Sequence, residues 1–107
     1  MSTCTEFAVF EVKETNLTRV IALSESLFIE INAEQDNIIA HEILVKTDNA
    51  EEICWHLTWV NVEAVEACST QWSTYPSAAE IERLVGKKLY YGHFVSVVAS
   101  TEKLYID

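Results

Sequence analysis

The 107-residue sequence predicts an α+β fold in which a four-stranded antiparallel sheet carries its helices on one face. The first observation is the hydrophobic period, which switches between about two and about 3.6 residues along the chain and so separates strands from helices. The second is that cap and turn residues stand where the period changes. The third is the resulting element order, β-α-β-β-α-(α)-β.

The first strand is predicted over residues 6–13, "EFAVFEVK". Phe7 and Val9 point to one side, and Ala8, Phe10 and Val12 point to the other, so both faces carry apolar groups, as in a central strand. Residues 16–34 then carry apolar side chains three and four positions apart, which is one stripe of an amphipathic helix. Asn16 is predicted to cap the amino-terminal end of this helix.

Residues 38–46 and 52–60 are rich in β-formers and flank the turn chemistry of Asp48 and Asn49, which predicts a hairpin. A turn centred near Asn49 gives cross-strand partners whose numbers sum to about 98. This register predicts the pairs Ile43 with Trp55, His41 with Leu57, and Glu42 with His56. One face of the hairpin is then strongly apolar and is formed by Ile39, Ile43, Ile53, Trp55, Leu57 and Trp59. The other carries Ala40, Glu42, Leu44, Cys54, His56 and Thr58.

The second half of the chain predicts a helix capped by Asn61 and ended near Pro76, because a proline disfavours the helical conformation of the residue before it. A short third helix follows, with Ser77 and Glu80 as a capping box and Gly86 as its left-handed stop. Residues 88–99 form the last strand, in which Gly92 marks a bulge or a close approach.

A right-handed crossover between the first two strands arranges these elements as a ferredoxin-like sheet. The helices cover only one face, so Phe10, Val12, Leu44 and half of the last strand are expected to be exposed on the other. Apolar patches of this kind usually mark association, and a homodimer with two sheets face to face closes the surface most simply. The apolar tail, residues 102–107, is expected to dock on the partner subunit.

The composition limits the function. A net charge of −10 with seven scattered basic residues excludes a phosphate-binding stripe, so neither nucleic acid nor an anionic membrane is an expected partner. No basic and apolar leader starts the chain, and the longest uncharged run, residues 89–101, is too short to span a bilayer. Cys4, Cys54 and Cys68 form no paired or metal-binding pattern, which favours a reducing, cytoplasmic location.

The hairpin ending in Thr58-Trp59, the following "VEAVEACSTQW" and then "STYPSAAEIERL" resemble the dimeric α+β-barrel superfamily, and within it the antibiotic-biosynthesis-monooxygenase-like domains. The resemblance covers nearly the whole chain as a single domain, residues 1–107. It implies a pocket between sheet and helices that is lined by aromatic side chains. It also implies oxygenation of a small aromatic or quinone-like compound without metal or flavin.

The haem-degrading branch of that superfamily uses an Asn on the first strand, a Trp on the second helix and a His just after it. Only Trp72 fits this pattern, because residues 6–13 contain no Asn and residues 77–85 contain no His. Haem is therefore not expected, and neither is another cofactor or a metal, since His41, His56 and His93 lie on three different strands.

The candidate site residues follow from these patterns. Trp59, Trp72 and Tyr75 are predicted to line a ligand pocket near the end of the second helix. Glu42 and His56 form the sharpest polar pair, because a carboxylate beside an imidazole raises its basicity and suits a general base. Each of these residues also has a packing interpretation, so a non-catalytic ligand-binding or structural dimer module is the alternative function.

Overall fold

The computed structural model describes residues 2–98, so the tail predicted to dock on a partner lies outside the described residues. Strand β1 (Cys4–Val12) is followed by a 3-10 turn η1 (Glu14–Asn16), helix α1 (Leu17–Ile31) and the hairpin β2 (Ile38–Lys46) and β3 (Asn49–Trp59). Helix α2 (Val62–Thr70), the 3-10 turn η2 (Trp72–Thr74), helix α3 (Ala78–Leu84) and strand β4 (Val85–Val95) complete the order.

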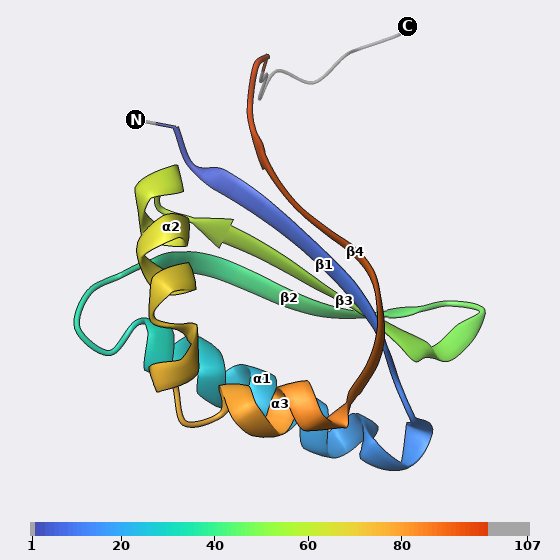
Figure 1. Ribbon diagram of the computed structural model, residues 1–107. Coiled ribbons are helices and arrows are strands. Elements are labelled where there is room, and N and C mark those ends of the chain that lie inside the picture. The colour runs from blue at the N-terminus through green and yellow to red at the C-terminus, as the bar shows by residue number, and fades with distance from the viewer. Residues whose placement is uncertain (1, 99–107) are drawn as a thin grey trace, which may run out of the picture.

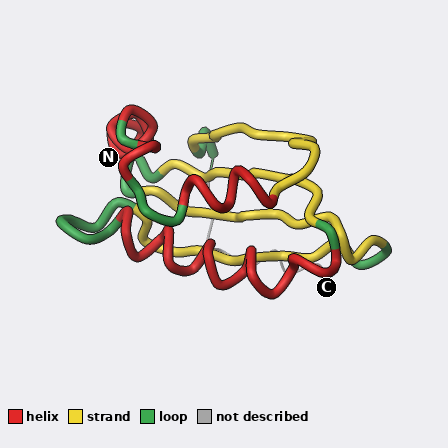
Figure 2. Tube along the Cα trace, turned by 60° about the horizontal axis from the view of Figure 1, so that its bottom comes forward, coloured by secondary structure: helices red, strands yellow, loops and turns green. Residues whose placement is uncertain are grey.

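The four strands form one antiparallel sheet in the order β2-β3-β1-β4, which confirms the ferredoxin-like prediction. All three helices lie against one face of this sheet (Figures 1 and 2). The core lies between the two layers and includes the fully buried side chains of Val12, Leu27, Ile53 and Leu57. As predicted, β1 is a central strand.

The opposite side of the sheet is called the open face here. It carries Thr5, Phe7, Val9, Leu44, Cys54, His56, Tyr90 and Phe94, which share the alternate positions of the four strands. The prediction that Phe10 and Val12 belong to this exposed side was wrong. Both side chains are buried under the helices, because they have the same parity as Ala8 in β1.

The hairpin register is confirmed from His41 to Val45: Glu42 lies opposite His56, and Ile43 lies opposite Trp55. An irregularity between Ile38 and Ala40 changes the pairing at one end of the hairpin. The extra residue moves Ile38 onto the buried face and leaves Ile39 more than half exposed, which corrects the predicted place of Ile39.

Two of the predicted helix caps were wrong. Asn16 ends the η1 turn with helical backbone angles, and its side chain makes no capping bond. Ser77 does not pair with Glu80. Its backbone N–H and hydroxyl both donate to the carboxylate of Glu30 in α1, at 3.0 and 2.6 Å, and Glu80 instead binds Arg19. By contrast, Asn61 caps α2 as predicted, since its side-chain oxygen accepts from the N–H of Ala64 at 2.8 Å.

Gly86 is not a left-handed helix stop. No residue of the described chain has a positive φ, and the chain passes from α3 directly into β4 at Val85. Contrary to the prediction, Gly92 is neither a bulge nor a close backbone approach, because it pairs in register with Phe7 and its nearest neighbour is a side chain. A Cβ placed on Gly92 would lie 2.8 Å from the hydroxyl of Tyr90, which covers it.

Candidate functional site

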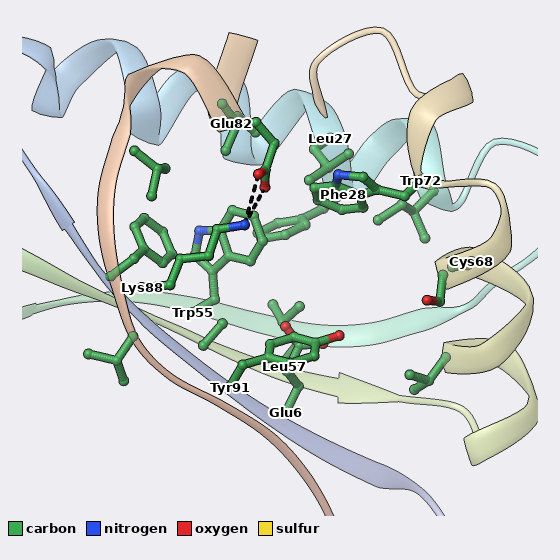
Figure 3. A pocket seen from close by; sticks show the side chains of 18 of the residues that line it. Glu6, Leu27, Phe28, Trp55, Leu57, Cys68, Trp72, Glu82, Lys88 and Tyr91 are labelled. Atoms are coloured by element: carbon green, nitrogen blue, oxygen red, sulfur yellow. Dashed lines mark hydrogen bonds and ion pairs between the residues drawn. The ribbon is translucent and has the colours of Figure 1, made fainter. Parts of the chain in front are cut away.

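A cavity of about 440 Å³ lies between the sheet and the helices (Figure 3). This volume is in the range of small-molecule sites. Its walls are mostly apolar and aromatic, with side chains that include Phe28, Trp55, Leu57, Trp59, Trp72 and Ile81. Its polar lining residues include Glu6, Ser69, Glu82, Lys88 and Tyr91.

The cavity borders the place where the chain leaves α2. After Thr70 the backbone tightens into η2, and Tyr75 then takes an extended conformation, as expected for a residue before proline. Trp72, in that tight turn, is half-buried and contributes its ring to the cavity wall. The break between α2 and α3 therefore supplies one aromatic side of the site.

A buried carboxylate stands on the sheet side of the cavity. Glu6 occupies a helix-facing position of β1, where its neighbours Cys4 and Ala8 are core residues. Its Oε1 atom accepts the indole N–H of Trp59 at 3.0 Å and lies 2.9 Å from Nε2 of His93. Side chains from β1, β3 and β4 therefore meet at the Glu6 carboxylate, because β1 lies between the other two strands.

Burial raises the pKa of Glu6 above its ordinary value, although the contacts with His93 and Trp59 act in the opposite direction. The pKa of Tyr91 is raised as well, first by burial and then by the nearby charge of Glu6. The charge of Glu6 therefore acts on the hydroxyl of Tyr91 as well.

The second oxygen of Glu6, Oε2, receives no hydrogen bond from residues 2–98. In the same part of the chain, every side-chain nitrogen or oxygen that is sealed from solvent has a hydrogen-bond partner. Glu6 is among the residues that line the cavity, so its carboxylate borders that space.

An ion pair contributes charged groups to another part of the lining. Lys88 Nζ donates to both carboxylate oxygens of Glu82, at 2.9 and 2.8 Å (dashed lines in Figure 3). Both side chains are largely exposed, so the pair contributes little to stability. It does place a cation and an anion beside the otherwise apolar walls.

The predicted pocket residues have different environments. Trp59 and Trp72 line the cavity, and Trp59 is also a core residue bound to Glu6. Tyr75 packs against the core. Burial, and after it the neighbouring Cys68 thiol, raise the pKa of the Tyr75 hydroxyl. Tyr75 is not among the residues that line the cavity.

His56 and Glu42 are paired as the register predicts, with 3.0 Å between Nδ1 and Oε1. The pair lies on the open face, where the His56 ring stacks on Phe7 at a centroid distance of 4.8 Å. The sheet separates it from the cavity. The catalytic role of His56 and Glu42 stays a prediction, and it would require a ligand bound on the open face.

No group of three metal-ligating side chains comes together within residues 2–98. His41 is paired with Glu25 of α1, and His93 with Glu6. Cys4, Cys54 and Cys68 are free thiols. Nor does any helix in the described chain have the length and apolar content needed to cross a membrane.

The sequence interpretation missed Glu6 and took His93 for an ordinary strand residue. One signal was present: Glu6 shares its strand face with the apolar residues Ala8, Phe10 and Val12, and the structure shows that this face is the buried one. The pairing of Glu6 with His93 links residues 87 positions apart, and no local pattern fixes that register.

No family model matches the chain, and no curated protein matches it. Solved structures do. SnoaB, a cofactor-independent oxygenase from Streptomyces nogalater, matches in a variant form with a TM-score of 0.71 and 18% identity, covering 95% of this chain and all of that one. A protein from Chloroflexus aurantiacus J-10-fl, provisionally named an antibiotic biosynthesis monooxygenase, matches with a TM-score of 0.71 and 13% identity over 92% of this chain and 97% of that one.

The chain has the antibiotic biosynthesis monooxygenase-like fold. The resemblance inferred from the sequence is thus confirmed at the level of fold. Protein SO0527 from Shewanella oneidensis shares it, with a TM-score of 0.68 and 19% identity over 92% of this chain and 94% of that one. Sequence identities this low show a shared fold and nothing about the reaction. The reaction therefore has to be inferred from the residues of the site.

Proposed function

We propose that this protein is a cofactor-independent oxygenase, or a related enzyme, that acts on a small aromatic or quinone-like compound bound in the cavity. The observation that carries the proposal is the cavity itself, with aromatic walls and a buried carboxylate among a few polar groups. Flat aromatic compounds match such walls, because ring faces and edges pack favourably against Trp and Phe side chains. The shared fold with SnoaB supports an oxygenase.

The proposed reaction uses dioxygen as the oxidant. In the oxygenase form, a ring methylene of the substrate becomes a carbonyl, one oxygen atom enters the product and the other leaves as water. In the related oxidase form, a hydroquinone loses two electrons and two protons to become a quinone, and dioxygen becomes hydrogen peroxide. Apolar walls suit both forms, because they exclude water from a reactive, electron-rich ring.

We also propose a homodimer built on the open face. Phe7, Phe94 and Tyr90 form an aromatic row there, with ring centroids 6.0 and 6.5 Å apart, and Phe94 is about half exposed, at 49%. A second copy would cover this row together with His56 and Glu42. The free cysteines support a reducing location such as the cytoplasm.

The reaction is tested by oxygen uptake in an oxygen electrode with anthrone and 1,4-dihydroxynaphthalene, each corrected for its spontaneous oxidation. Ser69 of α2 is exposed and lines the cavity, so Ser69→Phe should block entry and lower uptake at least about tenfold. The matched control is Ala67→Phe, which adds the same ring to an exposed position of the same helix away from the cavity, and which should leave uptake unchanged.

The second candidate function is a non-catalytic ligand-binding or structural dimer module. It is favoured by the pairing of the cavity's charges, since Glu6, Glu82 and Lys88 all have partners within the protein. If both aromatic compounds bind without any protein-dependent oxygen uptake, the binding module replaces the oxygenase.

A further inference from the structure

We propose that Glu6 accepts a proton from the hydroxyl group of the bound aromatic compound, and that His93 and Trp59 are the residues that position it. The inference rests on the proposed function, since it needs an aromatic ligand in the cavity. It goes further in naming the chemical class, a phenol or hydroquinone, and the group that receives its proton.

The two oxygens of Glu6 differ in their surroundings. Oε1 accepts from Trp59 at 3.0 Å and contacts His93 at 2.9 Å, whereas Oε2 has no donor among the described residues and belongs to a side chain that lines the cavity. Two fixed contacts on one oxygen hold the carboxylate plane in place, and the other oxygen is left for a ligand. The side chain is 4% exposed, so bulk water does not compete freely for it.

The described chain contains two other His–Glu pairs, His41 with Glu25 and His56 with Glu42, and both are more exposed than His93 and Glu6. His56 and Glu42 have nearly the same separation, 3.0 Å, but their side chains are 33% and 64% exposed, and the pair stands on the open face. The side chains of His93 and Glu6 are 22% and 4% exposed, and Glu6 lines the cavity. Burial favours Glu6 as the proton acceptor, because a desolvated carboxylate is the stronger base.

Proton transfer moves charge between two sites without another reactant. The O–H bond of the ligand breaks, its electron pair stays on the ligand oxygen, and a new O–H bond forms at Oε2. Glu6 becomes neutral and the ligand becomes a phenolate, which is the electron-rich form that reacts with dioxygen in the proposed function.

Several titratable groups lie near Glu6 and must be considered. His93 and Tyr91 face it from β4, and Cys4 lies two residues away on β1. The charge of Glu6 raises the pKa of both Tyr91 and Cys4, so neither is the more acidic partner.

The test uses two probes with the same ring, 4-nitrophenol and nitrobenzene, of which only the first has a hydroxyl. Affinities are measured by equilibrium dialysis, and the absorbance of bound 4-nitrophenol reports whether it is protonated. In the ground state, a carboxylate next to the hydroxyl keeps the bound phenol protonated to higher pH than the free probe. Wild-type protein should bind 4-nitrophenol about 10- to 100-fold more tightly than nitrobenzene, as expected for a hydrogen bond to a charged group.

Glu6→Gln should remove this preference and the upward pKa shift of the bound probe, with nitrobenzene affinity unchanged. Glu25→Gln is the control, because Glu25 also pairs with a histidine, His41, but is exposed and is not among the residues that line the cavity. His93→Gln, which keeps a donor, should retain most of the preference, whereas His93→Leu should reduce it.

The outcomes separate the two proposals. Binding of neither probe to the cavity contradicts the proposed function. Equal binding of both probes to the wild type overturns the role of Glu6 and leaves the cavity in place. The comparison of the two probes on wild-type protein decides the question even if Glu6→Gln does not fold.

Discussion

Glu6 stands at a position of β1 where the strand pattern calls for an apolar side chain. The fold accommodates the charge with two hydrogen-bonding neighbours, Trp59 and His93, which come from the strands on either side. At this scale the sequence shows which residues of a strand share a face, since parity groups Glu6 with Phe10 and Val12, but it did not show that this face is the buried one. It does not show which residues meet across strands, because the β1–β4 register depends on the whole sheet.

Because the pKa of Glu6 is raised in the folded state, the direction in which the free energy of unfolding changes with pH can be predicted. The unfolded carboxyl titrates near 4.5, and the folded one titrates higher. Between these two values the folded state binds the extra proton, so the free energy of unfolding falls as pH rises through this window. Thermal unfolding between about pH 4 and pH 8 should therefore show Glu6→Gln gaining stability relative to its parent as pH rises.

His93 contacts the Glu6 carboxylate, so the comparison is made in the His93→Gln background. His93→Gln alone is compared with His93→Gln combined with Glu6→Gln, and only Glu6 then differs. Parallel profiles for the two proteins would show that Glu6 has an ordinary pKa in the folded state.

At the scale of elements, periodicity in the sequence located the described helices and strands, but several of their ends were misplaced. Asn61 caps α2 because the cap is a local bond, formed with Ala64 three residues away. The predicted bond between Ser77 and Glu80 is absent because Glu30, 47 residues earlier, takes both donors of Ser77. Local rules hold where no distant side chain competes, and packing between helices decides the rest.

The two asparagines predicted as caps form a matched pair. Asn61→Ala should lower the free energy of unfolding by about 1 kcal/mol, because the N–H of Ala64 loses its acceptor. Asn16→Ala should change it by less than about 0.5 kcal/mol, because the Asn16 side chain caps nothing. Urea unfolding of the two variants and the wild type measures both values, and equal effects would contradict the assignment of the caps.

Glu30 joins α1 to the start of α3 through Ser77. Glu30→Ala should destabilise the protein by about 1–3 kcal/mol, because Ser77 is buried and loses the acceptor for two donors. A double-mutant cycle with Ser77→Ala should show strong coupling, measured by thermal unfolding. Additive effects of the two substitutions would mean that the pair contributes nothing as a unit.

At the scale of the molecule, the element order was enough to predict the sheet topology, because few arrangements satisfy the crossover rule. The same order left one sheet face without helices, and the structure shows that face bare. What could not be predicted is the cavity, since its volume depends on how α2 and α3 separate near Pro76 and on how the side chains pack there.

The open face gives a test of the proposed dimer. Leu44→Asp and Phe94→Asp each place a charge on partly exposed positions of this face and should convert a dimer to a monomer in analytical ultracentrifugation. Ile29→Asp is the control, because Ile29 is strongly exposed on α1, on the helix side of the sheet. A wild-type protein that sediments as a monomer at every concentration would contradict the dimer.

The central claim, that the cavity holds a small aromatic compound, is tested most directly by a crystal structure of the protein grown with 1-naphthol. The expected result is ring density beside Trp72, with the hydroxyl oxygen about 2.6–3.2 Å from Oε2 of Glu6. A cavity filled by Trp72 and its neighbours, with no naphthol between sheet and helices, would contradict the claim.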